Sequence, residues 1–124
     1  RAKEIRTSLD PQCLSGFRKN EAYEIEHSDV ILTVDNGDVI FLDCAYEELL
    51  QSLGPINDTS PVPWTRLNDS VQMGYFDVFD QYILNILYDP RIRAGMTVQE
   101  VNAVIPQVLA DVRGWVTKVN GLGE

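Results

Sequence analysis

The first part of the chain alternates apolar and polar positions as β-strands do. Residues 13–17 form a short, largely apolar stretch, and residues 23–27 alternate apolar with acidic side chains, which is typical of a strand with one wet face. Residues 30–34 continue this second strand. The Asp-Asn-Gly-Asp sequence at 35–38 favours a hairpin turn, because Asn and Gly accept positive φ. We therefore predict that residues 39–42 return as another strand.

A helical pattern follows the predicted strands. Asp43 is placed to cap a helix, because its carboxylate can accept the first amide protons. Leu49, Leu50 and Leu53 give that helix an apolar face, and the Gly-Pro pair at 54–55 predicts its end. The next twenty or so residues, to about residue 75, are rich in Pro, Asn, Asp, Ser and Thr. They predict a long irregular loop.

Capping residues mark two more helices. Asp77 is expected to begin one, and the Asp-Pro pair at 89–90 to end it. Thr97 and Glu100 form a capping box for the last helix, which Pro106 is expected to kink or split. Strands thus precede helices, which predicts an α+β fold with a small, mostly antiparallel sheet.

The chain has the size of a single domain. Its 124 residues are 44% apolar and 23% charged, as in ordinary globular proteins. We expect one domain over residues 12–118, a polar lead-in at 1–11 and a flexible tail at 119–124. Because the chain starts with Arg1, we expect it to be a processed product or a fragment.

Charge and hydropathy narrow the classes of partner. The net charge is −9 and the pI is about 4.4. Nucleic acid is not an expected partner, because phosphate contacts need clustered Lys and Arg. The sequence contains no apolar run long enough to span a membrane.

The cysteines and the single histidine carry little information by themselves. Cys13 and Cys44 fit two buried thiols in a reducing compartment and a disulfide in an exported protein equally well. His27, the only histidine, cannot build a His-rich metal site. We interpret it as a partly buried strand residue.

The segment at 47–57 resembles the active-site helix of zinc peptidases, His-Glu-x-x-His-x-x-Gly-x-x-His. Its spacing matters because positions i and i+4 share one helical face and can hold one metal ion. Glu48 occupies the general-base position, and Glu47, Gln51 and Asn57 occupy the three ligand positions. Because none of the three is histidine, zinc is not expected, although oxygen ligands suit a hard divalent cation. Glu and Gln are also strong helix formers, so the segment equally fits an ordinary helix.

A longer set of matches resembles a bacterial family of unknown function, whose members are exported and related to the zincin (metzincin-like) peptidases. The matching residues are Cys44, Glu47, Glu48, Gln51, Leu53, Gly54, Asn57, Asp58, Asn68, Asp69, Leu87, Tyr88, Asp89, Pro90, Gly95 and Met96. The resemblance covers about residues 13–116. Ala94 stands where that family usually has Pro.

This resemblance implies a zincin-like fold with a degenerate active-site motif and an extracytoplasmic location, periplasmic or secreted. If the protein is exported, a disulfide between Cys13 and Cys44 is expected to fix the start of the helix to the sheet.

Three functional hypotheses follow. The first is a pseudo-peptidase that binds an extended peptide or a protein partner by strand addition and does not cut it. The second is a purely structural domain. The third is a hydrolase in which Glu47, Glu48 and Asp58 hold a hard cation, with help from Gln51 or Asn57. We favour the first, without a cofactor, and lean against enzymatic activity because the histidine ligands are missing.

Overall fold

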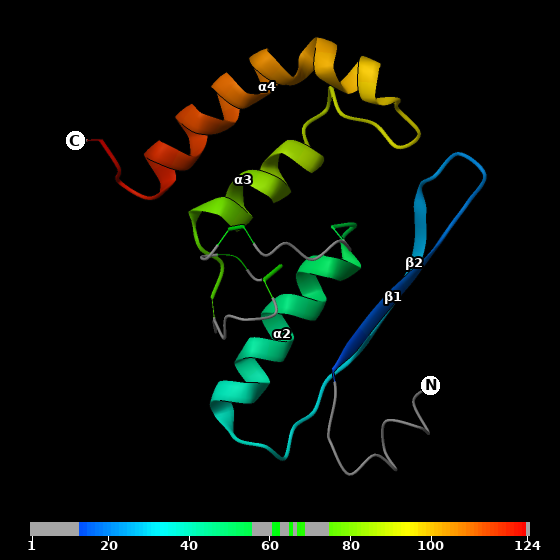
Figure 1. The fold of residues 1–124 in the computed structure, drawn as a ribbon, viewed down its shortest axis with the longest axis vertical. Coiled ribbons are helices and arrows are strands. Elements are labelled where there is room, and N and C mark those ends of the chain that lie inside the picture. Colours follow the sequence, from blue (N-terminus) through cyan, green and yellow to red (C-terminus); the bar gives the residue numbers. More distant parts are fainter. Residues whose placement is uncertain (1–12, 56–60, 63–64, 66, 69–74, 124) are drawn as a thin grey trace.

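The computed structural model describes residues 13–55, 61–62, 65, 67–68 and 75–123 as a small α+β fold (Figure 1). Two strands come first and three helices follow, in the predicted order. The elements are β1 (Leu14–Lys19), β2 (Ile25–Ile31), α2 (Asp38–Ser52), α3 (Val78–Leu87) and α4 (Val98–Val119).

β1 and β2 form a two-stranded antiparallel sheet, which confirms the first two predicted strands. Leu14 pairs with Ile31, and a bulge near the turn places Lys19 opposite Ile25. Asn20 organises the turn, because its Oδ1 accepts hydrogen bonds from the backbone N–H groups of Ala22 and Glu24, both 2.9 Å long.

One face of this sheet lies against α2. Ser15 Oγ donates to Gln51 Oε1 over 3.5 Å, and Ser28 Oγ donates to the Ser52 carbonyl oxygen over 2.9 Å. Because side chains alternate along a strand, the neighbouring residues point to the opposite face. That face is polar and exposed at Arg18, His27 and Asp29.

The predicted returning strand at 39–42 is wrong, because these residues form the first turn of α2. The helix begins at Asp38 with Gly37 as its N-cap, and the Phe41 N–H donates to the Gly37 carbonyl oxygen over 3.0 Å. Asp43 therefore lies inside the helix and does not cap it. Extending the helix backward over residues 39–42 adds one backbone hydrogen bond for each residue. A third strand would instead need the edge of a neighbouring strand to pair with. Gly37 adopts the positive φ expected of the turn, 90°, but it lies at the N-cap of α2 and not in a hairpin.

α3 and α4 pack against each other and enclose the main hydrophobic core. Val108, Val112 and Val116 of α4 are buried at its centre. The side chains packed around them are Val78, Tyr82, Ile86, Ile92 and Val104. Figure 1 shows α4 running back alongside α3, with the loop between them reaching toward the hairpin turn.

Local capping chemistry sets the ends of both helices, as predicted. Asp77 caps α3 by accepting a hydrogen bond from the Val78 N–H over 2.7 Å. The Thr97–Glu100 capping box is formed at the start of α4. Pro106 does not split α4, which continues as one helix to Val119.

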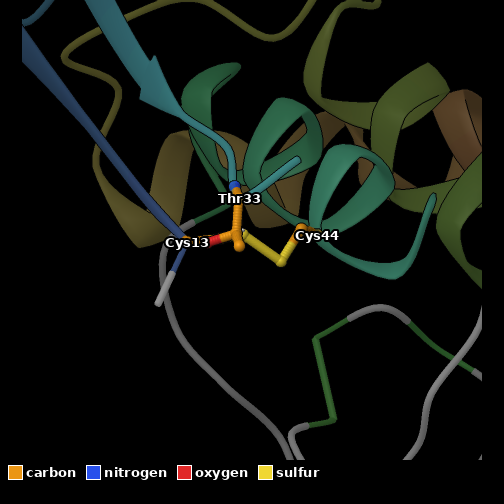
Figure 2. Close-up of a disulfide and its surroundings, with 3 residues drawn as sticks. All are labelled: Cys13, Thr33 and Cys44. Carbon is orange, nitrogen blue, oxygen red and sulfur yellow. Dashed lines mark hydrogen bonds between the residues drawn. A yellow bond between two sulfur atoms is a disulfide. The ribbon is translucent and has the colours of Figure 1, made fainter. Parts of the chain in front are cut away.

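A disulfide between Cys13 and Cys44 joins the start of β1 to α2, and confirms the expected pairing (Figure 2). The Cα atoms of the two cysteines are 5.8 Å apart. The Thr33 N–H, beyond the end of β2, donates to Cys13 Sγ over 3.3 Å. Both ends of the hairpin are therefore held near the middle of α2.

In the part of the chain that the structure describes, no helix has the length and apolar character needed to cross a membrane.

Candidate functional site

The residues expected at the vestigial zinc site lie on the second half of α2. Glu48 is buried, with 6% of its surface exposed, and Glu47 and Gln51 are half-buried one helical turn apart. Gln51 Oε1 accepts the hydrogen bond from Ser15 and so faces the sheet. Asn57 and Asp58 lie outside the described residues.

These side chains do not make a suitable zinc site. Zinc in proteins is held by imidazole, thiolate and carboxylate groups, and a neutral amide whose oxygen already accepts a hydrogen bond is a poor substitute. Within the described ranges, no three His, Cys, Asp or Glu side chains are grouped so that they could hold a metal ion. The residues have the spacing of the motif, but their side chains are not those that hold zinc.

Beside α2, a buried polar contact ties the loop segment to α3. Thr65 Oγ1 donates a hydrogen bond to Asp80 Oδ1, and both side chains are fully buried. Thr65 Oγ1 also accepts from the Leu67 N–H over 3.1 Å, and Asn68 Nδ2 donates to the Val62 carbonyl oxygen over 2.8 Å. Asp80 of α3 therefore holds Thr65 in place through this hydrogen bond.

Gly54 forms the sharp turn that the motif requires of its glycine. Its φ is 129°, in a region that other residues rarely adopt. A Cβ atom built on it would lie 3.1 Å from Leu87 Cδ2. The end of α2 and the end of α3 therefore meet at this glycine.

A hollow lies beside this meeting point, and we call it the hairpin groove. Its volume is about 680 Å3, and apolar groups supply most of its surface. It is lined by Phe17, Lys19, Tyr23, Glu24, Ile25, Leu53, Gly54, Leu87, Tyr88, Asp89, Pro90, Ile92, Arg93 and Ala94. The wall is therefore shared by the hairpin, the end of α2 and the α3–α4 loop.

Specific contacts hold the walls of the hairpin groove together. Tyr88 Oη donates to the Leu53 carbonyl oxygen over 2.7 Å, which links the α3 end to the α2 end. A Cβ atom on Gly95 would lie 3.3 Å from the Ala22 carbonyl oxygen, so the α3–α4 loop approaches the hairpin turn closely. Tyr23, in that turn, has φ of 65° and carries the Lys19 ammonium group 4.1 Å from its ring centre.

Charged groups at the edge of the groove form local pairs. Asp89 accepts two hydrogen bonds from the Arg91 guanidinium, 2.9 and 2.8 Å long, and Arg91 also contacts Asp111 at 2.9 Å. The side-chain and backbone hydrogen bonds from Arg91 lower the pKa of Asp89 to about 2. The hydrogen bonds that Arg91 donates to Asp89 and Asp111 raise the pKa of Arg91. Asp89 thus remains a carboxylate well into the acid range.

Glu100 is held in a similar way at the start of α4. Hydrogen bonds from the backbone and side chain of Thr97, with a further contribution from the charge of Arg93, lower the pKa of Glu100.

His27 lies on β2 as predicted. Half of its side-chain surface is exposed, which is more than expected for a partly buried strand residue. It hydrogen bonds Asp29 across 3.0 Å, on the sheet face that points away from α2. The predicted alternation of buried and exposed positions is not found either, because residues 25–29 of β2 are all exposed.

The sequence did not indicate the hairpin groove. The sequence pattern predicts only a helix face and its end at Leu53 and Gly54, and a helix stop at residues 89–90. Tyr23 was assigned only to a strand. The groove arises because these segments, distant along the chain, meet in space. One local signal was present in the sequence. The apolar run of α3 extends to Leu87 and Tyr88, beyond the residues needed for its buried face.

Comparison with known proteins identifies one family. The family model described as "Protein of unknown function (DUF2927)" matches residues 1–107 of the chain. No curated protein and no solved structure matches it.

Proposed function

We propose that this chain, which belongs to the DUF2927 family of proteins of unknown function, is a catalytically degenerate zincin-like domain that binds an extended peptide segment without cleaving it. The observation that carries this proposal is the hairpin groove, an open and mainly apolar hollow beside a two-stranded sheet. Extended peptides bind such places because a sheet edge offers backbone hydrogen bonds and adjacent pockets accept side chains.

Three features favour a zincin-like origin. The order of antiparallel strands, long helix, irregular segment and further helix is the order expected of that group. Glu48 is buried on the helix at the general-base position, and Gly54 turns the chain six residues later with positive φ. The disulfide at Cys44 and the family resemblance also fit an extracytoplasmic protein.

The residues at the ligand positions favour binding over catalysis. A zinc peptidase needs a metal ion to polarise its water, and Glu47 and Gln51 replace the two helical histidines. Without that ion, Glu48 has no metal-bound water to deprotonate. The groove can still hold a peptide, because its apolar lining does not depend on the ligand positions.

The peptide half of the proposal can be tested with two tyrosine variants. Short linear peptides would be selected from a displayed random library, and their affinities measured by fluorescence anisotropy. Tyr23→Asn removes a groove ring, and Asn tolerates the positive φ at this position. Tyr75→Asn is the matched control, because Tyr23 and Tyr75 are 60% and 56% exposed and only Tyr23 lines the groove.

We expect micromolar binding that Tyr23→Asn weakens by about tenfold or more and Tyr75→Asn leaves unchanged, because interface aromatic residues often dominate affinity. Mass spectrometry should find the peptide intact after incubation with zinc, manganese or calcium. Failure to select any peptide, or equal binding by both variants, contradicts the binding role. Peptide cleavage that Glu48→Gln abolishes contradicts the loss of catalysis.

The zincin ancestry has a separate test. Glu47→His, Gln51→His and Asn57→His together should restore three zinc ligands if the chain turns back after Gly54 as in zincins. The control is Gln99→His with Ala103→His, an exposed pair with the same spacing on α4. We expect the triple variant to bind zinc at least about tenfold more tightly than the control pair, by about 1.4 kcal/mol. Equal affinities in folded proteins count against the ancestry.

A purely structural role is the second candidate, and one observation favours it. Glu48 of α2, Thr65 and Asn68 of the loop, and Asp80 of α3 are buried polar side chains. Buried polar groups of this kind commonly fix one arrangement of the chain. If this is their whole role, peptide selection fails and Glu48→Gln changes only stability.

A further inference from the structure

We infer that the hairpin groove selects acidic peptides, in which a large apolar residue is flanked by Asp or Glu. This inference rests on the proposed binding function and adds the chemistry of the ligand. It follows from the shape of the groove, from its apolar lining and from the unequal way in which its acidic and basic side chains are paired.

The shape suits an extended chain. The central hollow of about 680 Å3 adjoins two smaller ones of about 310 and 420 Å3. It shares Gly54, Leu87 and Ile92 with the first, and Glu24, Arg93 and Ala94 with the second. The three hollows are therefore neighbours that share parts of their walls, and we call them the row. A row of separate hollows suits successive side chains of an extended peptide better than one compact molecule.

The middle of the row suits a large apolar side chain. Ile25, Leu53, Leu87 and Tyr88 each keep more than a third of their surface exposed, although all line the groove. Covering them with an aromatic or branched aliphatic side chain would remove apolar surface from water, which is the main source of favourable binding free energy.

Each acidic side chain of the row already accepts a hydrogen bond from within the molecule. Glu24 Oε2 accepts a 2.9 Å hydrogen bond from Asn20 Nδ2, and Glu100 Oε2 accepts a 2.6 Å bond from the Thr97 N–H. Asp89 is paired with Arg91. A ligand carrying a positive charge would have to compete with these contacts.

The basic side chains of the row, Lys19 and Arg93, are not paired in this way. Neither forms an ion pair with a carboxylate of the described residues, and the Lys19 ammonium lies over the ring of Tyr23. Both line the central hollow, and Arg93 also lines the neighbouring one. The groove thus offers two cations on a chain whose net charge is −9, and a peptide carboxylate complements them.

The test uses peptides selected as above and two double variants of equal charge. Lys19→Gln with Arg93→Gln removes both groove cations. Arg113→Gln with Lys118→Gln removes two exposed cations from α4 and is the matched control. Each protein is titrated with a selected peptide and with its counterpart in which Asp and Glu become Asn and Gln.

We expect selected peptides to be rich in acidic residues beside an aromatic or aliphatic one. The groove variant should lose about tenfold in affinity for the acidic peptide, as expected for two exposed ion pairs, and the control should lose little. The amide counterpart should bind both variants alike. High salt should reduce the difference between the two peptides.

Two results would overturn the inference. If amide and acidic peptides bind equally and both depend on Tyr23, peptide binding stands and the acidic preference is wrong. If laurate, a fatty acid with the same apolar and carboxylate groups, binds more tightly than every selected peptide and displaces it, the groove serves a lipid. Failure to select any peptide instead removes the proposed function itself.

Discussion

The Thr65 hydroxyl donates a hydrogen bond to the Asp80 carboxyl group where neither side chain has any contact with solvent. This contact holds a segment of irregular backbone against α3. Loss of the hydroxyl would leave a buried acceptor with one partner fewer, and such losses are costly because water cannot replace the missing donor.

Thr65→Val, which keeps the shape of the side chain, should therefore lower the free energy of unfolding by about 2 kcal/mol. Urea denaturation measures this change. Thr65→Ser keeps the hydroxyl and is the control. Thr65→Ser should lower the free energy of unfolding by only about 1 kcal/mol, because it removes one buried methyl group. Equal losses for Val and Ser would show that the hydrogen bond contributes nothing.

Alanine substitutions at two glycines should have opposite effects. Gly54→Ala places a Cβ 3.1 Å from Leu87 at a φ of 129°, and should destabilise the protein by about 1–3 kcal/mol. Gly114→Ala, in the exposed interior of α4 where a Cβ meets nothing within 4 Å, should stabilise it by up to about 1 kcal/mol. Thermal unfolding of both variants measures the signs, and stabilisation by Gly54→Ala would contradict the strained turn.

Reduction of the disulfide should destabilise the protein without changing its fold. The Cys13–Cys44 bond closes a loop with a sequence separation of 31. Its removal gives the unfolded chain more conformational freedom. In the chain-entropy model this lowers the free energy of unfolding by about 3–4 kcal/mol. Urea denaturation with and without a reductant measures the loss. The Cys13→Ser and Cys44→Ser double variant should match the reduced protein and no longer respond to reductant.

The Asp89–Arg91 pair should make stability depend on pH in the acid range. The pKa of Asp89 falls from 3.8 to about 2 in the folded protein because Arg91 favours the carboxylate. The native state therefore binds this proton only at lower pH than the unfolded state does. The stabilisation is complete above about pH 4 and is lost as the pH falls toward about 2.

Asp89→Asn should remove this part of the pH dependence, as measured by thermal unfolding between about pH 5 and pH 2. Arg91→Gln provides the control background. With the guanidinium absent, the Asp89→Asn substitution should alter the slope less, because only the backbone N–H of residue 91 still donates to Asp89. A slope unchanged by Asp89→Asn in the native background would mean that other carboxyl groups account for the acid sensitivity.

Local chemistry explains which elements were predictable from the sequence. Asp77 and the Thr97–Glu100 box specify helix starts through contacts within one turn, and both were predicted correctly. The strand predicted at residues 39–42 rests on their apolar run and on the Asn-Gly turn before them. Their actual state depends on the helix that follows them and on the pairing of β1 with β2, and neither is visible in a window of four residues.

The candidate site was predictable to a smaller extent. The spacing of Glu47, Glu48 and Gln51 placed them correctly on one helix, because helical periodicity fixes neighbours. The hairpin groove could not be predicted in the same way. Its walls, such as Tyr23 and Tyr88, come from segments that meet only after the hairpin packs against the end of α2 and the α3–α4 loop.

Among the residues that the structure describes, the apolar side chains packed around Val108, Val112 and Val116 come from residues 78–104, and none comes from the hairpin. The α3–α4 half can therefore remain ordered while the hairpin opens, because local opening is easiest where few buried apolar contacts must be broken. Amide hydrogens of β2 should then exchange faster than those of α4. A ligand seated in the hairpin groove would touch both halves, so its binding should slow exchange in the hairpin and make the two halves unfold as one cooperative unit.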